Sequence, residues 1–387
     1  MSTLKSMRLH IGFFGKTNVG KSLLINKIVG QDVSIVSEIA GTTTDIVEKS
    51  MELLPIGPIT LIDTAGLDDK TELGNKRIEK TMSVINRCDI AVIVCDFNGL
   101  DDTEYDLINK FKQLGIPYLV IMNKCDEVQN NIGENVLYTS AKNDGNFIFK
   151  FKDAILKLIP EKYSPKIVGD LVKPKDVVIL VTPIDKEAPK GRLILPQVQT
   201  IRDLLDNDCL VYVVKESELQ NAFDSLKNNP ALVVTDSQAF KTVSEIVPDE
   251  VPLTSFSILF ARLKGDLDSF IEGSTAIENL KDGDKILILE SCTHHAIEDD
   301  IGKVKIPNLI RKKTGKNLIF EHFSGHDFPD ISEYSLVIHC GACMTNRREV
   351  LSRILIANNL KVPITNYGVV ISYCLGILPR ATKIFTS

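Results

Sequence analysis

Two short segments rich in cysteine and histidine are the residues of this sequence best suited to bind a metal. One is Cys292-Thr293-His294, and the other is His339-Cys340-Gly341-Ala342-Cys343. Each follows an apolar run that predicts a buried strand, 285–289 in the first case and 334–338 in the second. Two thiols three residues apart, separated by Gly and Ala, can turn inward onto one soft metal centre. The two segments together predict a metal site at the ends of two strands.

A cubane iron–sulfur cluster with one iron lacking a thiolate would suit the three cysteines of these segments, which are Cys292, Cys340 and Cys343. The fourth position could stay open for exchange, or it could be filled by one of three side chains: His294, His339 and Asp185. Asp185 lies in a polar loop rich in Pro and Gly (182–192), for which a solvated connection is the alternative interpretation. The same residues could instead build a zinc site with three Cys and one His.

A phosphate-binding loop lies near the N-terminus. The octamer Gly15-Lys16-Thr17-Asn18-Val19-Gly20-Lys21-Ser22 matches G-x-x-x-x-G-K-S, between a predicted strand (9–14) and a predicted helix (22–29). Gly15 and Gly20 let backbone N–H groups surround the phosphates. We expect Lys21 to reach the β- and γ-phosphates and the Ser22 hydroxyl to bind Mg²⁺.

The remaining motifs of a GTPase follow in order. Gly41-Thr42-Thr43-Thr44-Asp45 offers a switch threonine; which threonine binds Mg²⁺ is open, and we favour Thr43. Asp63 ends a predicted strand (59–62) and can hold Mg²⁺ through water, while Gly66 can meet the γ-phosphate. The predicted guanine pocket comprises Asn123, Lys124, Asp126, Ser140, Ala141 and Lys142. Asp126 can accept two hydrogens that guanine offers and adenine does not, which disfavours the alternative of a P-loop ATPase.

Slow hydrolysis is predicted by the residue that follows Gly66. Many GTPases carry a glutamine there that orients the attacking water, but this chain carries Leu67. An apolar side chain cannot do that, so catalysis must come from elsewhere. Glu72 is a candidate in the switch-like segment that follows, and a solvated loop charge is the alternative interpretation of that residue.

Length and composition indicate a globular protein of two or three domains. The chain has 387 residues, a net charge of −6, 44 % hydrophobic residues and eight irregularly spaced Cys. The charge gives no reason to expect nucleic-acid binding, and the Cys spacing does not resemble a disulfide framework. We found no signal peptide and no apolar stretch long enough to span a membrane. We therefore expect a cytoplasmic protein with neither a membrane nor a nucleic acid as partner.

The elements around these motifs predict an α/β fold, with an N-terminal P-loop GTPase domain and two smaller α/β domains. Residues 1–160 form the GTP-binding domain, 161–258 a dimerisation domain, and 259–387 the domain that binds the metal. Three strand–helix units in the middle domain predict a small parallel sheet, with strands at 177–181, 210–214 and 231–235. Pairing of its exposed edges across a two-fold axis would make a homodimer. The last domain is expected to open on one long helix from 257 to 270.

The motifs of the first domain resemble those of the translation-factor-related GTPases, in particular the branch that includes tRNA-modifying and ribosome-assembly GTPases. In that branch a P-loop Asn and a G-T-T-x-D switch accompany hydrolysis stimulated by potassium. Asn18 and Gly41–Asp45 fit this pattern. The resemblance implies that K⁺ bound at Asn18 supplies the charge that an arginine finger supplies elsewhere.

The whole chain resembles the HydF family, the GTPase and scaffold maturases of iron–iron hydrogenase. The combination of Gly15–Ser22, Asp63–Gly66 and Asn123–Asp126 with Cys292–His294 and His339–Cys343 carries this resemblance. It implies three domains, a homodimer with a tetramer as a further state, and a [4Fe–4S] cluster on Cys292, Cys340 and Cys343. It also implies a diiron subcluster precursor as cargo. The implied partners are the radical-SAM maturases HydE and HydG and apo iron–iron hydrogenase.

Two other functions compete with this interpretation. The first is a potassium-dependent GTPase in tRNA modification or ribosome assembly with a structural zinc domain. Aromatic residues are only 6 % of the chain and Trp is absent, and no RNA-binding signature is visible. The second is an oxidoreductase with a redox-active cluster, for which no flavin or dinucleotide fingerprint is present.

Overall fold

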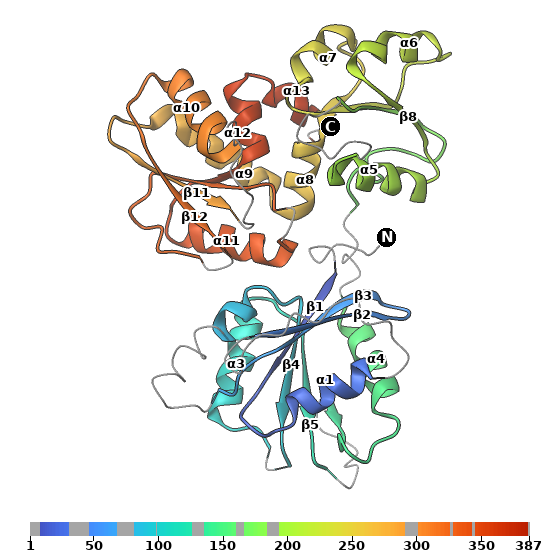
Figure 1. Cartoon of the computed structure of the whole chain (residues 1–387), viewed down its shortest axis with the longest axis vertical. Helices are drawn as coiled ribbons and strands as arrows, with labels where there is room; N and C mark the ends of the chain where they lie inside the picture. Colours follow the sequence, from blue (N-terminus) through green and yellow to red (C-terminus); the bar gives the residue numbers. More distant parts are fainter. Residues whose placement is uncertain are drawn as a thin grey trace. The chain divides into compact units, whose positions relative to one another are not determined.

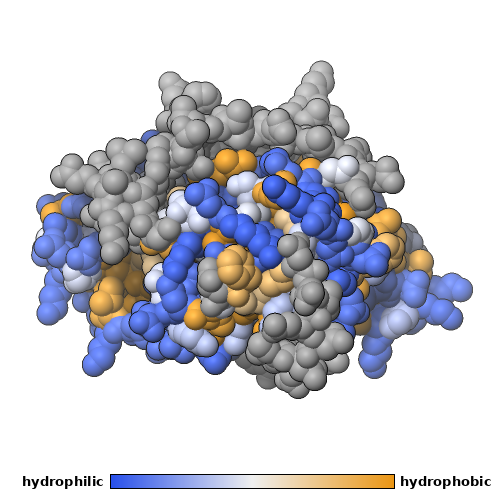
Figure 2. All heavy atoms as spheres, turned by 90° about the horizontal axis from the view of Figure 1, so that it is seen from below, coloured by the Kyte–Doolittle hydropathy of each residue, from blue (hydrophilic) through white to orange (hydrophobic). Residues whose placement is uncertain are grey.

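A computed structural model describes residues 8–30, 46–67, 81–97, 99–125, 135–159, 166–183, 193–290, 301–325, 328–342 and 345–385. The chain divides into two compact units, Met1–Ser164 and Pro165–Ser387. Among the described residues, no helix has the length and apolar character needed to cross a membrane. On the face of the molecule drawn in Figure 2, hydrophobic patches alternate with hydrophilic residues.

The first unit is built on a six-stranded sheet in the order β2-β3-β1-β4-β5-β6, in which only the β2–β3 pair is antiparallel (Figure 1). Its strands are β1 (Leu9–Phe14), β2 (Val47–Leu53), β3 (Gly57–Asp63), β4 (Ile90–Cys95), β5 (Tyr118–Met122) and β6 (Val136–Tyr138). Strands β1 and β4 are buried along their whole length, as the continuous apolar sequence of β4 and the mostly apolar sequence of β1 predict for central parallel strands.

Helices cover both faces of this sheet. Helices α1 (Lys21–Val29) and α4 (Phe147–Leu158) pack on one face, and α3 (Asp102–Gln113) packs on the other. Helix α3 begins at a capping box, in which Asp101 accepts from the N–H of Thr103 and Glu104 accepts from the N–H of Asp101. The predicted nucleotide motifs follow the carboxyl ends of β1, β3 and β5, which the helices described above do not cover.

The second unit contains two four-stranded sheets that are parallel throughout, in the orders β10-β9-β7-β8 and β12-β11-β13-β14 (Figure 1). The strands of the first are β7 (Val177–Val181), β8 (Leu210–Val214), β9 (Leu232–Thr235) and β10 (Leu253–Ser255). Those of the second are β11 (Lys285–Glu290), β12 (Ile319–Ser324), β13 (Leu336–His339) and β14 (Ile364–Asn366). The short strands β10 and β14 add to the strands that the sequence predicted.

The two sheets share one topology. In each, the first strand along the chain is central, the second lies at one edge, and the third and fourth follow on the other side. A matching turn precedes the first strand: the N–H of Lys173 donates to Asp176 Oδ2, and the N–H of Lys281 donates to Asp284 Oδ2, both at 2.8 Å. We call the two sheets with their helices the first and second modules.

The two modules are also similar in sequence at their last strands. The segment Val251-Pro252-Leu253-Thr254 matches Val362-Pro363-Ile364-Thr365. The carbonyls of Pro252 and Pro363 each accept a 2.9 Å hydrogen bond from the neighbouring third strand. A helix follows at once in both cases, capped by Ser255 in the first module and by Asn366 in the second. The second unit therefore consists of two copies of one α/β fold.

The helices of the first module are α5 (Leu195–Asp206), α6 (Leu219–Asp224), α7 (Phe240–Ile246) and α8 (Phe256–Lys264). Those of the second are α9 (Leu267–Thr275), α10 (Ile306–Thr314), α11 (Arg347–Asn359), α12 (Tyr367–Cys374) and α13 (Leu378–Thr382). The single helix predicted for 257–270 is wrong, because the chain breaks between α8 and α9. A Cβ at Gly265 would lie 2.4 Å from the Phe270 ring, so the break depends on glycine.

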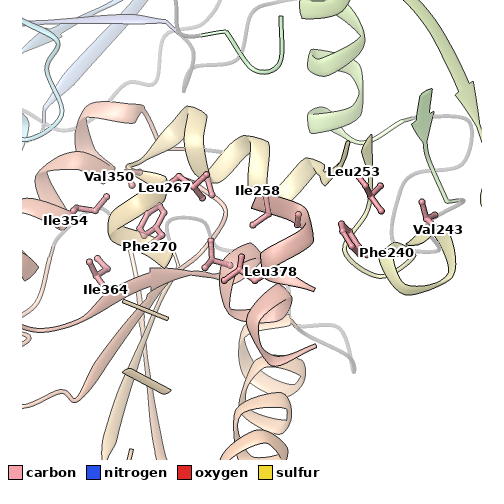
Figure 3. Packing of buried hydrophobic residues seen from close by; sticks show 14 of the residues in the cluster. Phe240, Val243, Leu253, Ile258, Leu267, Phe270, Val350, Ile354, Ile364 and Leu378 are labelled. Carbon is pink, nitrogen blue, oxygen red and sulfur yellow. The ribbon is translucent and has the colours of Figure 1, made fainter. Parts of the chain in front are cut away.

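One hydrophobic core joins the two modules (Figure 3). It runs from Phe240 and Val243 of α7, through Ile258 of α8, to Val350 and Ile354 of α11. Reciprocal hydrogen bonds fix the same junction. Arg347 Nη1 donates to the carbonyls of Arg262 (2.9 Å) and Leu263 (2.6 Å), while Lys264 Nζ donates to the carbonyl of Thr345 (3.2 Å). The end of α8 is thus held against the segment that follows Cys343.

Candidate functional site

The phosphate loop lies between β1 and α1, as predicted. Gly15 and Gly20 have positive φ angles of 138° and 101°. A Cβ at Gly15 would lie 2.2 Å from the Val94 carbonyl oxygen, and one at Gly20 would lie 2.4 Å from Asn123 Nδ2, so both positions require glycine. Lys21 is 7 % exposed, and its ammonium donates to the carbonyls of Gly15 (2.8 Å) and Lys16 (2.7 Å). This places the cation inside the loop, where phosphates would bind.

The two predicted Mg²⁺ ligands of the described residues lie together. Ser22 Oγ donates to Asp63 Oδ2 at 2.5 Å, and the other oxygen of Asp63 is buried without a hydrogen-bond partner. Burial raises the pKa of Asp63, while the Ser22 hydrogen bond and the Lys21 charge oppose that shift. A buried oxygen without a partner beside a hydroxyl suits a hard cation such as Mg²⁺. Thr43 and Glu72 lie outside the described residues.

Asn123 connects the phosphate loop to the predicted guanine pocket. Its side chain is 1 % exposed; Nδ2 donates to the Val19 carbonyl at 2.8 Å, and Oδ1 accepts from the Ala141 N–H at 2.9 Å. Lys124 has a φ of 62°, which turns the chain sharply after β5. Ser140 and Ala141 are buried, and the adjacent Lys142 is exposed. Asp126, the predicted guanine reader, is not among the described residues.

Lys27 of α1 is a further site residue, which the sequence pattern did not reveal. Its ammonium donates to the carbonyls of Ala141 (3.0 Å) and Asp144 (2.7 Å). Asp144 also accepts from Thr139 Oγ1 and Lys150 Nζ, both at 3.0 Å, and these partners lower its pKa against the opposing effect of burial. Lys27 therefore ties the helix after the phosphate loop to the loop after β6. A lysine in a helix carries no sequence signal for that role.

The cysteine segments follow two neighbouring strands. Strands β11 and β13 pair directly, with Leu289 opposite His339, and the Cys340 N–H donates to the Leu289 carbonyl at 2.8 Å. The chain leaves β11 toward the neighbouring strand β12, whereas it leaves β13 in the opposite direction, toward β14. The carboxyl ends of β11 and β13 therefore lie at a topological switch point. Cys292 comes two residues after β11 ends. The cysteine segments therefore begin at the place where open α/β sheets bind their ligands.

Only part of this second site belongs to the described residues. Cys340 is buried, with 9 % exposure, while Cys292, His294, Cys343 and Asp185 lie outside the described part of the chain. Within that part, no group of three or more metal-ligating side chains gathers. A buried thiol at a switch point is a donor suited to iron or zinc, so the described portion fits a soft metal centre.

His339 is enclosed on all sides. It is 1 % exposed, Nδ1 lies 2.8 Å from the Cys340 carbonyl oxygen, and Nε2 lies 2.8 Å from Arg353 Nη1. Arg353 is itself held by Glu349, with Nη2 2.7 Å from Oε1. Burial, and then the Arg353 charge, lower the pKa of His339 to about 4. Of the ligands predicted for this second metal site, only His339 and Cys340 are among the described residues, and they are consecutive in the sequence.

Three family models match separate parts of the chain. The model described as 50S ribosome-binding GTPase matches residues 10–124. The Hydrogen maturase F dimerization domain matches residues 167–265, which contain the first module, and the Hydrogen maturase F tetramerization domain matches residues 268–384, which contain the second.

The curated relatives that match this chain include GTPases of two kinds. The tRNA modification GTPase MnmE of Caldicellulosiruptor saccharolyticus is 26 % identical over 234 residues, which cover 59 % of this chain and 49 % of the relative. GTPase Der of Clostridium botulinum is 37 % identical over 129 residues, which cover 32 % of this chain and 29 % of Der. The chain thus spans less than half the length of these relatives.

Solved structures of GTPases are also similar to this chain. Era of Aquifex aeolicus bound to GDP and AlF₄⁻ is 20 % identical, with a TM-score of 0.33 and coverage of 53 % of this chain and 92 % of Era. The G domain of the T. maritima FeoB iron transporter is 19 % identical, with a TM-score of 0.30 and coverage of 40 % of this chain and 99 % of that domain.

The fold, the phosphate loop and the match to a GTPase family model define a P-loop GTPase followed by further α/β domains, which confirms the predicted fold class. The two modules after the GTPase domain identify its particular kind. The chain belongs to the hydrogen maturase F family, HydF.

Proposed function

We propose that this GTPase is a cytoplasmic iron–sulfur scaffold in hydrogenase maturation. It holds a [4Fe–4S] cluster on Cys292, Cys340 and Cys343, carries a diiron subcluster precursor, and delivers it to apo iron–iron hydrogenase. The radical-SAM maturases HydE and HydG supply that precursor. The cluster provides an iron with a replaceable ligand, to which the cargo attaches. The single observation that carries the proposal is the pairing of β11 with β13, the two strands that precede the cysteine segments in the sequence, at one switch point.

Anaerobic reconstitution with iron and sulfide, read by EPR after reduction, tests the proposal. We expect a brown protein with a cubane signal that both Cys292→Ser and Cys340→Ser abolish. Cys209→Ser is the matched control, because Cys209 is buried in the first module (5 % exposed) and away from the cysteine segments. A colourless protein that holds one zinc would contradict the scaffold. It would favour a GTPase in tRNA modification or ribosome assembly with a structural zinc domain.

Slow hydrolysis stimulated by potassium is part of the same proposal. Leu67 is half-buried and packs against the apolar cluster that contains Ile62 and Ile93, so it leaves the attacking water without an orienting group. Asn18 is exposed and has a φ of 62°, which leaves its side chain accessible to a cation beside the phosphates. We expect hydrolysis to be faster in potassium chloride than in sodium chloride at equal ionic strength. Equal rates in the two salts would count against potassium binding.

A homodimer formed through β8 completes the proposed assembly, with a tetramer as a further state. β8 is an edge strand, and Leu210 (57 % exposed), Tyr212 (38 %) and Val213 (42 %) leave it apolar and open. Natural proteins usually cover or charge such an edge. Pairing of two copies of β8 across a two-fold axis would cover it and extend the sheet from one protomer into its partner.

A further inference from the structure

The His339 side chain lies on the other face of the sheet from the side chain that follows it. Within β13, Ile338 belongs to the apolar cluster that includes α10 and α12, whereas Val337 belongs to the cluster that includes α11. His339 continues the Val337 face, where it contacts Arg353 of α11. Because the Cys340 N–H still bonds across the sheet, the strand alternation extends by one residue and places Cys340 on the Ile338 face.

Both ring nitrogens of His339 have defined roles. An arginine side chain can only donate, so Nε2 must accept from Arg353 Nη1 at 2.8 Å. The ring proton then lies on Nδ1, which donates to the Cys340 carbonyl at 2.8 Å. Neither nitrogen has a lone pair left for iron in this arrangement.

Arg353 is fixed by several further contacts. Its Nη2 donates to Glu349 Oε1 at 2.7 Å and to the Gly325 carbonyl at 3.2 Å, and its guanidinium lies over the Phe328 ring at 5.8 Å. Glu349 is held in turn in the first turn of α11, where its N–H donates to the capping side chain of Asn346 at 3.1 Å. Arg353 and Glu349 are each 3 % exposed, so the charged pair is buried beside the imidazole.

We infer that His339 is a positioning residue rather than the fourth cluster ligand. His339, Arg353 and Glu349 form a buried relay that connects α11 to the backbone of Cys340. The relay fixes the Cys340 carbonyl and thereby the direction in which the backbone leaves the sheet after Cys340. The inference rests on the proposed cluster site and removes His339 from the candidates for its fourth ligand, which leaves His294, Asp185 or an exchangeable ligand.

Four variants of the full-length protein test the relay. His339→Asn keeps an amide N–H near the position of Nδ1 and has no imidazole, whereas His339→Ala removes the donor as well. Arg353→Gln leaves the imidazole in place and removes its anchor. His322→Asn is the matched control, because His322 is an exposed histidine on β12 of the same sheet.

The measurements are iron per chain, the rate of iron loss to a chelator, and nitrogen couplings in pulsed EPR. We expect His339→Ala and Arg353→Gln to lose iron about tenfold faster, as is typical for groups that orient metal ligands. His339→Asn keeps the bond to the Cys340 carbonyl but loses the contact to Arg353, so its rate of iron loss should lie between those of the unaltered protein and His339→Ala, with unchanged nitrogen couplings. Far-UV circular dichroism and the rate of GTP hydrolysis check that each variant is folded. If Arg353→Gln does not fold, Glu349→Gln serves in its place, with the same expected loss.

Two results would overturn the inference. One is a nitrogen coupling of the unaltered protein that disappears in His339→Asn. The other is unchanged iron retention in Arg353→Gln, because release of Nε2 from arginine would leave a histidine ligand intact or improve it. Failure of the proposed function looks different: the unaltered protein would then bind no iron at all, and the positioning role would fall with it.

Discussion

At the scale of single residues, neighbours in sequence have separate tasks. Cys340 and His339 both look like metal ligands by residue type, yet His339 contacts Arg353 of α11, and strand alternation assigns the residue after it to the opposite face of the sheet. Side-chain type therefore predicts which residues take part in a site, but strand alternation decides what each of them does. Arg353, which contacts His339, comes 14 residues later on helix α11, and no sequence motif predicts that contact.

Lys27 offers a test at the same scale, because it connects the helix after the phosphate loop to the loop after β6. We expect Lys27→Met to raise the dissociation rate of GDP about tenfold, since the part-buried carbonyls of Ala141 and Asp144 lose a charged donor, at a cost of about 1–3 kcal/mol. Stopped-flow measurements with a fluorescent guanine nucleotide give that rate. Lys157→Met is the control, because Lys157 pairs with the exposed side chain of Asp153 on the surface of α4 in the same unit. Equal dissociation rates for both variants would show that Lys27 does not support the pocket.

At the scale of elements, the hydrogen bonds of the edge strand β8 show which of its backbone groups face outward. The Leu210 N–H and the Val214 carbonyl form hydrogen bonds to backbone groups at the two ends of β7. Because backbone groups alternate in direction along a strand, the N–H and C=O groups of Val211 and Val213 point away from the sheet. A partner strand would pair with these outward groups. The edge strand β12 of the second module occupies the equivalent position, but there Arg311 lies over the ring of Phe320, 4.9 Å from its centroid.

Replacement of Val213 by proline removes an outward donor and leaves the bonds to β7 in place. We expect Val213→Pro to shift the full-length protein from dimer to monomer in sedimentation velocity. Val213→Ala, which keeps the N–H and loses only the side chain, should remain a dimer. If Val213→Pro sediments like the unaltered protein, the dimer does not form through this edge.

At the scale of the whole molecule, the sequence allowed the long apolar strands and the GTPase motifs to be predicted, because both are local patterns. It did not reveal β10 and β14, since three-residue strands such as Leu253–Ser255 carry too little periodicity. The sequence pattern also predicted one helix where α8 and α9 are separate, because the helical periodicity continues across Gly265. The close contact between Gly265 and Phe270 is visible only in the structure. The similarity of the two modules is shown by their strand order and shared turns, and neither of these can be predicted from sequence motifs.

The core of the second module does not depend on the cysteine segments. Ile286, Ile288, Leu336 and Ile338 are all fully buried beneath α10 and α12. We therefore expect Cys340→Ser, or removal of iron by a chelator, to shift the melting temperature by less than about 4 °C. Ile338→Ala, which opens a cavity in that core, should shift the melting temperature by more. Unfolding of the second module on chelation, followed by circular dichroism, would contradict this expectation.

The likeness of the two modules has a consequence for the ancestry of the protein. If one gene segment was duplicated, both copies inherited an open edge strand and an open switch point. Under the proposed function, the two copies then took on different roles, one using the edge for self-association and the other the switch point for metal binding. In the first module, Asp236 occupies the place of Cys340, one residue beyond the third strand. Under the proposed function, the metal site would then rest on a few residues at one switch point, which a lineage could gain or lose without remaking the fold.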